Sequence, residues 1–324
     1  ALPNNPTSAY PSSAFDDAVV LTGKTVSISS NTKTIGKVTV DGQLDIASTT
    51  GHSFTEIYGT GKILLAGDNF PSGDATNFIT AGQGEGIVEY YGNTRSLSVA
   101  RTFFDVVINM TAGQTLTLME DYIINGNLDV TQGIFKINDD ASTTALNISV
   151  EGDVTVAAAG QMITGTGNAR HQFNFNGDLT NNGTVKFTNR VAADVTIEAV
   201  NGIVDANFIN SSADQNILRN GTTNFYRIEI DKGTDRTYVL NIDATDATYF
   251  NLFGYAGFPH PTQANPPASV DDALGLTNGT VRIGNNIIIP TLKKAVSGNY
   301  NSYETCQLWV DGGTLQMNLG TNAL

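Results

Sequence analysis

A short cassette, a glycine turn followed by an alternating strand, recurs along this 324-residue chain and constrains its fold more than any other feature. Its glycines Gly126, Gly152, Gly177 and Gly202 are spaced by 26, 25 and 25 residues. The copies read INGNLDV from Ile124, VEGDVTV from Val150, FNGDLTN from Phe175 and VNGIVDA from Val200. Others begin at Val40, Thr277 and Val310. Periods of 20–50 residues are typical of solenoids, propellers and repeat arrays.

Within one cassette, the pattern predicts a tight turn and then a strand. Asn125-Gly126 favours a turn because this dipeptide adopts positive φ at little steric cost. Leu128 and Val130 then fall on one face of the strand, and the polar residues between them fall on the other. Each repeat therefore offers one apolar face to a core and one polar face to water.

The length of the period separates the candidate architectures. A propeller blade needs about forty residues, and an immunoglobulin-like sandwich repeats near a hundred. About 25 residues fit one coil made of two or three short strands, stacked on its neighbours by main-chain hydrogen bonds. The sequence thus predicts an all-β fold, a right-handed parallel β-helix (β-solenoid) with about 25-residue coils and loop insertions. The right hand is the one usual for such folds, because the sequence does not report it.

The same pattern predicts the domain organisation. Residues 1–20 are expected to form an irregular N-terminal segment or cap, and residues 21–324 a single β-helix. Loop-like insertions are expected at 66–84 and 253–275, where the period breaks. Proline cannot donate to a stacking ladder, and insertions in solenoids often mark a binding face. The strand-like end GGTLQMNLGTNAL predicts a fragment that continues C-terminally.

A longer repeat overlies the short one. GIVEYYGN from Gly86 precedes RTFFDVVINM, and GIVDANFIN from Gly202 precedes TNFYRIEIDK. At an offset of 122 residues, Phe103 corresponds to Phe225 and Val106 to Ile228. We expect such pairs to occupy equivalent places in the fold.

Charge and cysteine content exclude several functions. With 17 Lys and Arg against 31 Asp and Glu, the net charge of −14 argues against nucleic acid or an anionic membrane as partner. Cys306 is the single cysteine, so no disulfide forms within the chain, and its strand-like neighbours predict a buried, inert thiol. No run of 18 apolar residues appears, so no transmembrane segment is expected.

No catalytic or cofactor-binding residues are assigned. Asp129, Asp153 and Asp178 hold related places in successive cassettes, but a solvated turn is favoured over an acid pair for glycoside hydrolysis. His52, His171 and His260 lie too far apart in the sequence for a zinc motif. Calcium stays open as a weakly supported ligand of the acidic doublets Asp139, Asp140 and Asp271, Asp272.

Aromatic residues are the candidate ligand contacts. Sugars stack on exposed rings, and tandem aromatic residues on a strand place one ring inward and one outward. The candidates are Tyr91, Phe104, Tyr226 and Trp309.

The stretch GIVEYYG…FFDVVINMTAGQTLTLMEDYIINGNLDVTQGIFKIND, together with FNGDLTNNGTVKF, resembles a repeat found in very large secreted proteins of Bacteroidota. The resemblance covers most of residues 36–324 and is clearest over 86–240. Proteins with this repeat are cell-surface or secreted, and many are exported by the type IX system, including adhesins and gliding-associated proteins. The repeat is a spacer and display module, so the resemblance implies no catalytic residues.

These observations predict a non-enzymatic, extracellular module of a cell-surface adhesin or filament that acts as a rigid stalk and display surface. The expected partners are surface glycans or other cell-surface proteins, and the secretion machinery. A carbohydrate-active β-helix enzyme, either polysaccharide lyase or glycosidase, is the first alternative. A trimeric protein of the tail-spike type is the second.

Overall fold

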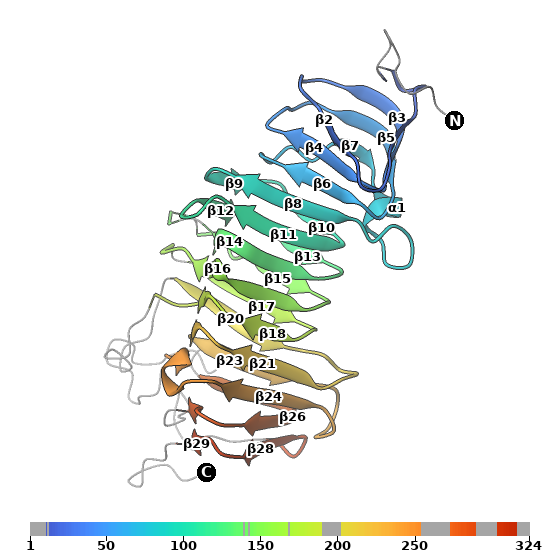
Figure 1. Cartoon of the computed structure of the whole chain (residues 1–324). Helices are drawn as coiled ribbons and strands as arrows, with labels where there is room; N and C mark the ends of the chain where they lie inside the picture. The colour runs from blue at the N-terminus through green and yellow to red at the C-terminus, as the bar shows by residue number, and fades with distance from the viewer. Residues whose placement is uncertain are drawn as a thin grey trace.

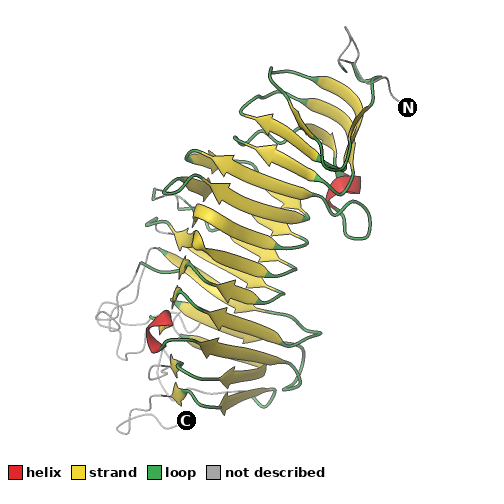
Figure 2. Ribbon diagram, in the orientation of Figure 1, coloured by secondary structure: helices red, strands yellow, loops and turns green. Residues whose placement is uncertain are grey.

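The computed structural model describes residues 11, 13–138, 140–141, 143–167, 169–189, 202–253, 273–289 and 303–315. Their regular structure is almost all β, and the helices among them are α1 (Thr76–Ile79) and the 3-10 turn η2 (Ala247–Tyr249) (Figure 2). The described strands follow one another along an elongated molecule, from the blue strands at one end to the red strands at the other (Figure 1). The fold is an all-β, solenoid-like arrangement of long parallel sheets. Neither helix has the length and apolar character needed to cross a membrane.

Four series of parallel strands make up the described part of the fold, and we name them by position. The N-terminal stack contains β1 (Ala18–Val20), β3 (Thr34–Val40), β5 (Ser53–Tyr58) and β7 (Ser72–Asp74). Stack one contains β2 (Thr25–Ser27), β4 (Gln43–Ala47), β6 (Lys62–Leu65), β8 (Ile87–Gly92), β11 (Asp105–Met110), β14 (Leu128–Ile137), β16 (Val154–Thr164), β18 (Leu179–Asn181), β21 (Gln215–Arg219), β24 (Val239–Ala244), β26 (Leu274–Ile283) and β28 (Cys306–Val310).

Stack two contains β9 (Arg95–Leu97), β12 (Thr115–Leu118), the C-terminal halves of β14 and β16, β19 (Thr184–Lys186), β22 (Thr222–Phe225) and β25 (Phe250–Leu252). Stack three contains β10 (Arg101–Phe103), β13 (Tyr122–Ile124), β15 (Asn147–Val150), β17 (Arg170–Phe175), β20 (Ile203–Phe208), β23 (Arg227–Asp231) and the start of β26. The short strands β27 (Ile288–Ile289) and β29 (Thr314–Leu315) pair with each other. From β10 to β25, the chain visits stack three, stack one and stack two in that order and then repeats.

Register keeps equivalent side chains directly above one another. In stack one, Leu128 pairs with Val154, and Val154 pairs with Leu179. The burial pattern alternates along most strands, as in β17, where buried and partly exposed residues take turns. This alternation confirms the predicted inward and outward faces of the strands, because successive side chains of a strand point to opposite sides.

The interior is apolar and, near its middle, aromatic. Phe175 and Phe208, on neighbouring strands of stack three, stack with ring centroids 4.8 Å apart and planes 8° apart. Phe187 packs against Phe173 at 5.5 Å and against Phe225 at 5.8 Å. Rings from stack two, from stack three and from the segment after β19 therefore meet inside one continuous core, which removes a large apolar area from water.

The sequence suggested that the cassette glycines provide positive φ, but in the structure they are needed because there is no space for a side chain. Gly126, Gly152 and Gly177 do not have positive φ. They lie one above another where stack three turns into stack one, and a Cβ on Gly152 would lie 2.6 Å from the carbonyl oxygen of Gly126. A Cβ on Gly177 would overlap the carbonyl oxygen of Gly152. Close approach of the preceding backbone excludes a side chain at Gly152 and Gly177, and the side chains of Asp105 and Phe104 crowd the same position at Gly126.

The regular spacing of 25 residues does not hold throughout, and one apparent copy lies at another corner. Gly202 has φ of 62° and lies before β20, with its N–H donating to the carbonyl oxygen of Gly167. It is therefore not part of the Gly126–Gly177 column. In the longer repeat, Val106 lies in stack one, whereas Ile228 lies in stack three. The expectation that the 122-residue offset joins equivalent places is wrong, because the matching segments follow different corners.

Two predicted segments, the irregular segment 1–20 and the insertion 66–84, differ from what the structure shows. β1 begins at Ala18, inside the segment 1–20 that was expected to be irregular. The predicted insertion 66–84 contains β7, which pairs in parallel with β5, and α1, whose Phe78 is fully buried. Much of this segment therefore continues the fold. In the second predicted insertion, 253–275, residues 254–272 lie outside the described residues.

A seam interrupts one side of the molecule. The N-terminal stack ends at β7 and stack three begins at β10, and no pairing joins these two strands within the described part of the chain. Stack one is continuous across the same level, where β8 pairs with both β6 and β11. The break leaves room for side chains that reach from the β6–β7 connection to the start of stack three.

Candidate functional site

The four aromatic candidates are spread over the molecule. Tyr226 is fully buried, so the expectation that it contacts a ligand from outside is wrong. The guanidinium of Arg170 lies over its ring, 5.4 Å from the centroid. The residue directly after an inward Phe225 was expected to point outward, but β22 ends at Phe225, so the alternation of that strand does not extend to Tyr226.

The other three rings are accessible to different degrees. Trp309 is 47% exposed on β28, with the guanidinium of Arg282 5.6 Å from its ring centroid. Phe104 is half-buried, and its ring packs beside Gly126. Tyr91 is half-buried, and its hydroxyl donates to Asp45 at 2.9 Å; burial, and then this carboxylate, raise the pKa of Tyr91 to about 12. The structure does not bring these residues together, and their role in ligand contact stays a prediction.

The carboxylates considered as an acid pair instead form a ladder along one corner. The Oδ1 atom of Asp105 accepts from the backbone N–H of Asn127, and that of Asn127 accepts from the N–H of Asp153, at 2.6 and 2.9 Å. Asp153 accepts in the same way from the N–H of Asp178 at 2.8 Å, and Asp178 accepts from the N–H of Asn216 at 2.8 Å. We call these five residues the Asx ladder. Each side chain satisfies a donor one turn away, which is a structural task.

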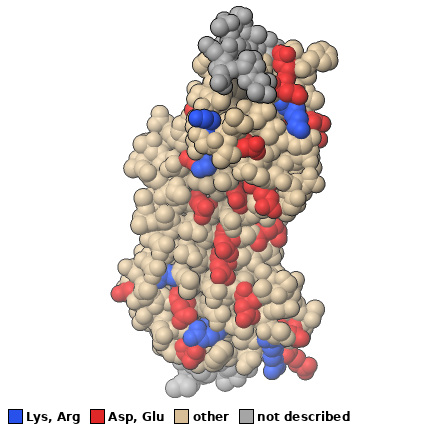
Figure 3. All heavy atoms as spheres, turned by 45° about the vertical axis from the view of Figure 1, so that its right-hand side comes forward, with Lys and Arg blue, Asp and Glu red and all other residues tan. Residues whose placement is uncertain are grey.

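Burial and neighbouring acidic side chains raise the pKa of two aspartates near the ladder. Burial raises the pKa of Asp105, and the charge of Asp129 adds to this shift. Burial likewise raises the pKa of Asp129, with Asp153 contributing. Figure 3 shows acidic side chains predominating along the middle of one face, which agrees with the net charge of −14. Among the described residues, no group of three or more His, Cys, Asp or Glu is arranged to hold a metal ion.

Of the four calcium candidates, Asp140 lies among the described residues. Asp140 forms an ion pair with Lys136 at 2.7 Å and accepts from the N–H and hydroxyl of Thr166 at 2.9 and 3.0 Å. The hydrogen bond from Lys136, and then that from the N–H of Thr166, lower the pKa of Asp140. A carboxylate already paired with an ammonium is a poor calcium ligand. Asp139, Asp271 and Asp272 lie outside the described residues.

Both described histidines accept a hydrogen bond from a backbone N–H group. His171 is 2% exposed, and its Nδ1 accepts from the N–H of Leu146 at 3.0 Å. Burial lowers its pKa to about 4, so the ring is neutral at physiological pH. In His52, Nδ1 accepts from the N–H of Lys33 at 3.3 Å, so Nε2 carries the proton and donates to the hydroxyl of Thr49 at 2.9 Å. His260 lies outside the described residues.

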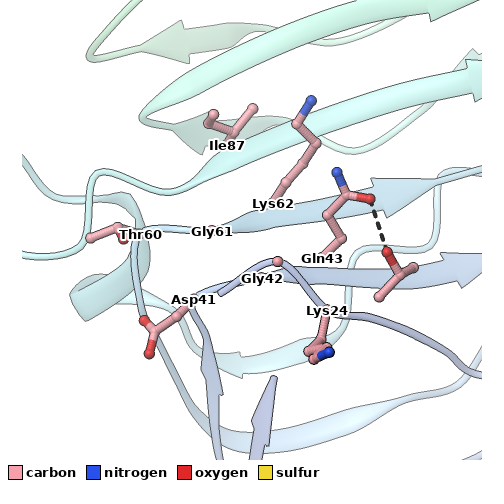
Figure 4. Close-up of a pocket in the computed structure, with 10 residues that line it drawn as sticks. Lys24, Asp41, Gly42, Gln43, Thr60, Gly61, Lys62 and Ile87 are labelled. Atoms are coloured by element: carbon pink, nitrogen blue, oxygen red, sulfur yellow. Dashed lines mark hydrogen bonds between the residues drawn. The ribbon is translucent and has the colours of Figure 1, made fainter. Parts of the chain in front are cut away.

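Two hollows of similar size lie on the N-terminal half. The first, which we call the lysine hollow, has a volume of about 310 Å³ and is shown in Figure 4. Lys24, Asp41, Gln43 and Lys62 line it with several glycines. Its polar groups are engaged: Lys62 pairs with Glu89 at 2.6 Å, and the hydroxyl of Thr25 donates to Gln43 at 3.2 Å. No aromatic side chain is among the residues that line it.

The second hollow lies at the seam, and we call it the seam hollow. Its volume is about 300 Å³, and its lining residues are Thr50, Gly51, His52, Asp68, Asn69, Phe70 and Ser72. This is at the lower end of the roughly 300–1,000 Å³ found for small-molecule sites. Phe70 is half-buried and packs against Phe103 of β10 with ring centroids 5.1 Å apart. The hollow thus combines an apolar wall with adjacent carboxylate and amide groups.

Contacts across the seam hold these groups in place. Asp68 accepts through Oδ2 from the N–H of Ser98 at 2.8 Å, and its Oδ1 lies 3.5 Å from Nη2 of Arg101. Asn69 is 9% exposed and donates through Nδ2 to the carbonyl oxygens of Ala47 and Thr49, at 2.9 and 2.6 Å. The Oδ1 atoms of Asp68 and Asn69 are buried and accept no hydrogen bond from the described residues.

No sequence pattern identified the seam hollow as a site. Asp68, Asn69 and Phe70 fall inside AGDNFPSG, at the start of the predicted loop insertion 66–84, and the spacing of His52 from the other histidines argued only against a zinc motif. The available signal was the insertion itself, since extra segments in solenoids often lie at a binding face. What the sequence did not reveal is that these residues meet Ser98 and Arg101 across a break in the strand stacking.

Comparison with known proteins gives no further guide to the site: no family model, curated protein or solved structure matches the chain.

Proposed function

We propose that this chain is a right-handed parallel β-helix that serves as a non-enzymatic, extracellular display module of a large cell-surface adhesin or filament. The observation that carries the proposal is the uninterrupted parallel pairing of stack one from β2 to β28. Main-chain hydrogen bonds along one direction make such an array stiff, and a stiff array holds whatever it carries away from the cell surface.

The Asx ladder supports the same proposal. In an enzyme built on stacked strands, carboxylates at one corner would be expected to face a cleft and to remain available for acid–base work. Asp153 and Asp178 are instead occupied by backbone donors of the next turn. The acidic surface suits a soluble extracellular object and disfavours nucleic acid as partner. Surface glycans or other surface proteins are the partners we propose, with export by a type IX-like machinery.

The test is an activity screen on pectin, alginate and glycosaminoglycans in millimolar calcium, with the appearance of unsaturated or reducing ends as readout. We expect no turnover. Turnover that disappears in Asp129→Asn, whose carboxyl is protonated more readily than usual, would replace the proposal with a carbohydrate-active enzyme. A stable trimer in solution would favour the tail-spike type. An experimental map with a left-handed chain path would contradict the proposed hand.

A further inference from the structure

We infer that the seam hollow binds a neutral sugar unit of a glycan. The inference rests on the proposed display function, because it supplies that function with a ligand. It starts from an imbalance: Asn69 lines the hollow and has a buried Oδ1 atom that accepts no hydrogen bond from the described residues, and the Oδ1 atom of its neighbour Asp68 has an ion-pair contact with Arg101 at 3.5 Å but no hydrogen bond from them. Buried acceptors without a donor are rare in folded proteins, and they favour a ligand or water that donates.

The contacts of Asn69 fix which end of its amide is available. Both protons of Nδ2 are directed to the carbonyl oxygens of Ala47 and Thr49, so the amide cannot rotate without losing two hydrogen bonds. Oδ1 points away from those carbonyls and is left as the acceptor. Asp68 is held similarly, since Oδ2 accepts from the N–H and the hydroxyl of Ser98 at 2.8 and 3.1 Å. Both acceptors are therefore preorganised.

The charges around these acceptors select a neutral donor. Arg101 lies 3.5 Å from Asp68 and 5.8 Å from the ring centroid of Phe70, so a guanidinium already neutralises the carboxylate. A calcium ion or an ammonium group would meet that positive charge. A sugar hydroxyl carries an O–H donor and no charge, so it suits the acceptor oxygen of Asn69 beside the paired Asp68 and Arg101.

The apolar wall fits the same ligand. Sugars present C–H groups on one face, and a half-buried aromatic ring such as Phe70 removes them from water. His52 completes the wall as a neutral ring whose nitrogens are both engaged. Burial lowers the pKa of His52, so this ring adds no positive charge to the hollow at neutral pH. Because Asp68 and Arg101 are paired, they leave no unpaired charge at the hollow that would favour an ionic sugar.

The lysine hollow provides a matched control within the same chain. It is nearly the same size, but it lacks an aromatic wall and lacks a buried acceptor without a donor among the residues that line it. An exposed threonine lies at each rim, Thr50 at the seam hollow and Thr60 at the lysine hollow. Thr50→Trp and Thr60→Trp therefore fill one hollow each with the same bulky side chain.

The experiment titrates the whole chain with methyl glycosides of glucose, galactose, mannose and N-acetylglucosamine and follows binding by saturation-transfer NMR. We expect at least one glycoside to bind the unmodified chain and Thr60→Trp equally, and to bind Thr50→Trp at least about tenfold more weakly. Phe70→Leu, which retains apolar volume but loses the flat ring, should also weaken binding. Circular dichroism checks that each variant is folded.

Three results would overturn the inference: no glycoside binds, Thr50→Trp binds as well as Thr60→Trp, or calcium chloride binds saturably and displaces the glycoside. These outcomes are distinct from failure of the display function, which depends on turnover in the activity screen. A chain that binds no glycoside and cleaves no polysaccharide would lose the seam site and keep the display role.

Discussion

The stretch from β13 to β18 and the stretch from β20 to β26 use the same kind of strand stacking with different means of closing the turns. In the first stretch, successive members of the Asx ladder are separated by 26 and 25 positions in the sequence, and the cassette glycines lie in a column. The next ladder contact, from Asp178 to Asn216, spans 38 residues, and Asp243 reaches Asn285 42 residues later. The spacing along the chain changes while the register across the stack is kept.

Buried polar groups replace the simple ladder in the second stretch. Lys232 is fully buried, and its ammonium donates to the carbonyl oxygens of Asn210 and Ala213 and to Oε1 of Gln215, at 3.1, 2.9 and 2.7 Å. Burial lowers the pKa of Lys232 to about 8. In the turns of about 25 residues, side chains of the Asx ladder accept from backbone N–H groups, whereas next to the longer connection the Lys232 side chain donates to backbone carbonyl groups.

The largest effect is expected at the glycine column. Gly177→Val places a side chain where the backbone of Gly152 lies, so neighbouring turns must separate. We expect a loss of about 4 kcal/mol in the free energy of unfolding, measured by urea denaturation. Gly113→Ala is the control: Gly113 has φ of 77° but open space around it, and about 1 kcal/mol of backbone strain is expected. Equal losses in the two variants would remove close packing as the explanation.

Lys232→Met tests the second stretch. The substitution leaves three buried acceptors without their donor, and we expect a loss of about 3 kcal/mol in thermal or urea unfolding. Lys186→Met, on an exposed position of β19, should change the free energy of unfolding by less than about 0.5 kcal/mol. If Lys232→Met were as stable as the native chain, the three hydrogen bonds of Lys232 would contribute nothing to closing the longer turn.

Acid should weaken the regular stretch through His171. Its folded pKa of about 4 lies below the usual 6.5, so the unfolded chain binds the proton more readily between these values. The stability that the neutral ring provides is present above pH 6.5 and is lost as pH falls towards 4. Between pH 6.5 and 5 this amounts to about 2 kcal/mol. His171→Gln should flatten that part of the profile, and an unchanged slope would place the acid sensitivity elsewhere.

The smallest effect is expected at a single step of the Asx ladder. Asp153→Ala leaves the N–H of Asp178 without its side-chain acceptor, and we expect a loss of about 1 kcal/mol. Asp153→Asn keeps an Oδ1 acceptor, as Asn127 does in the same ladder, so its unfolding midpoint should stay close to that of the native chain. A large loss in Asp153→Asn would show that the charge, rather than the hydrogen bond, matters.

Much of the fold could be predicted from local pattern. Alternation in LDV and its copies identified the inward residues Leu128, Val154 and Leu179, because a strand exposes its faces with a period of two. The seam hollow could not be predicted in this way. Asp68 meets Ser98, 30 residues away, only because β7 and β10 fail to pair, and no local pattern encodes that failure.

The amino-acid sequence by itself determined that this protein is built of short strands, which side of most strands is buried, and that glycines recur at turns. The tertiary structure alone decided which corner each glycine occupies, that Tyr226 is enclosed, and that Asp68 and Asn69 line a hollow at the seam. Strand alternation depends on neighbours in the chain, whereas corners, enclosure and hollows depend on backbones that meet after a full turn of variable length.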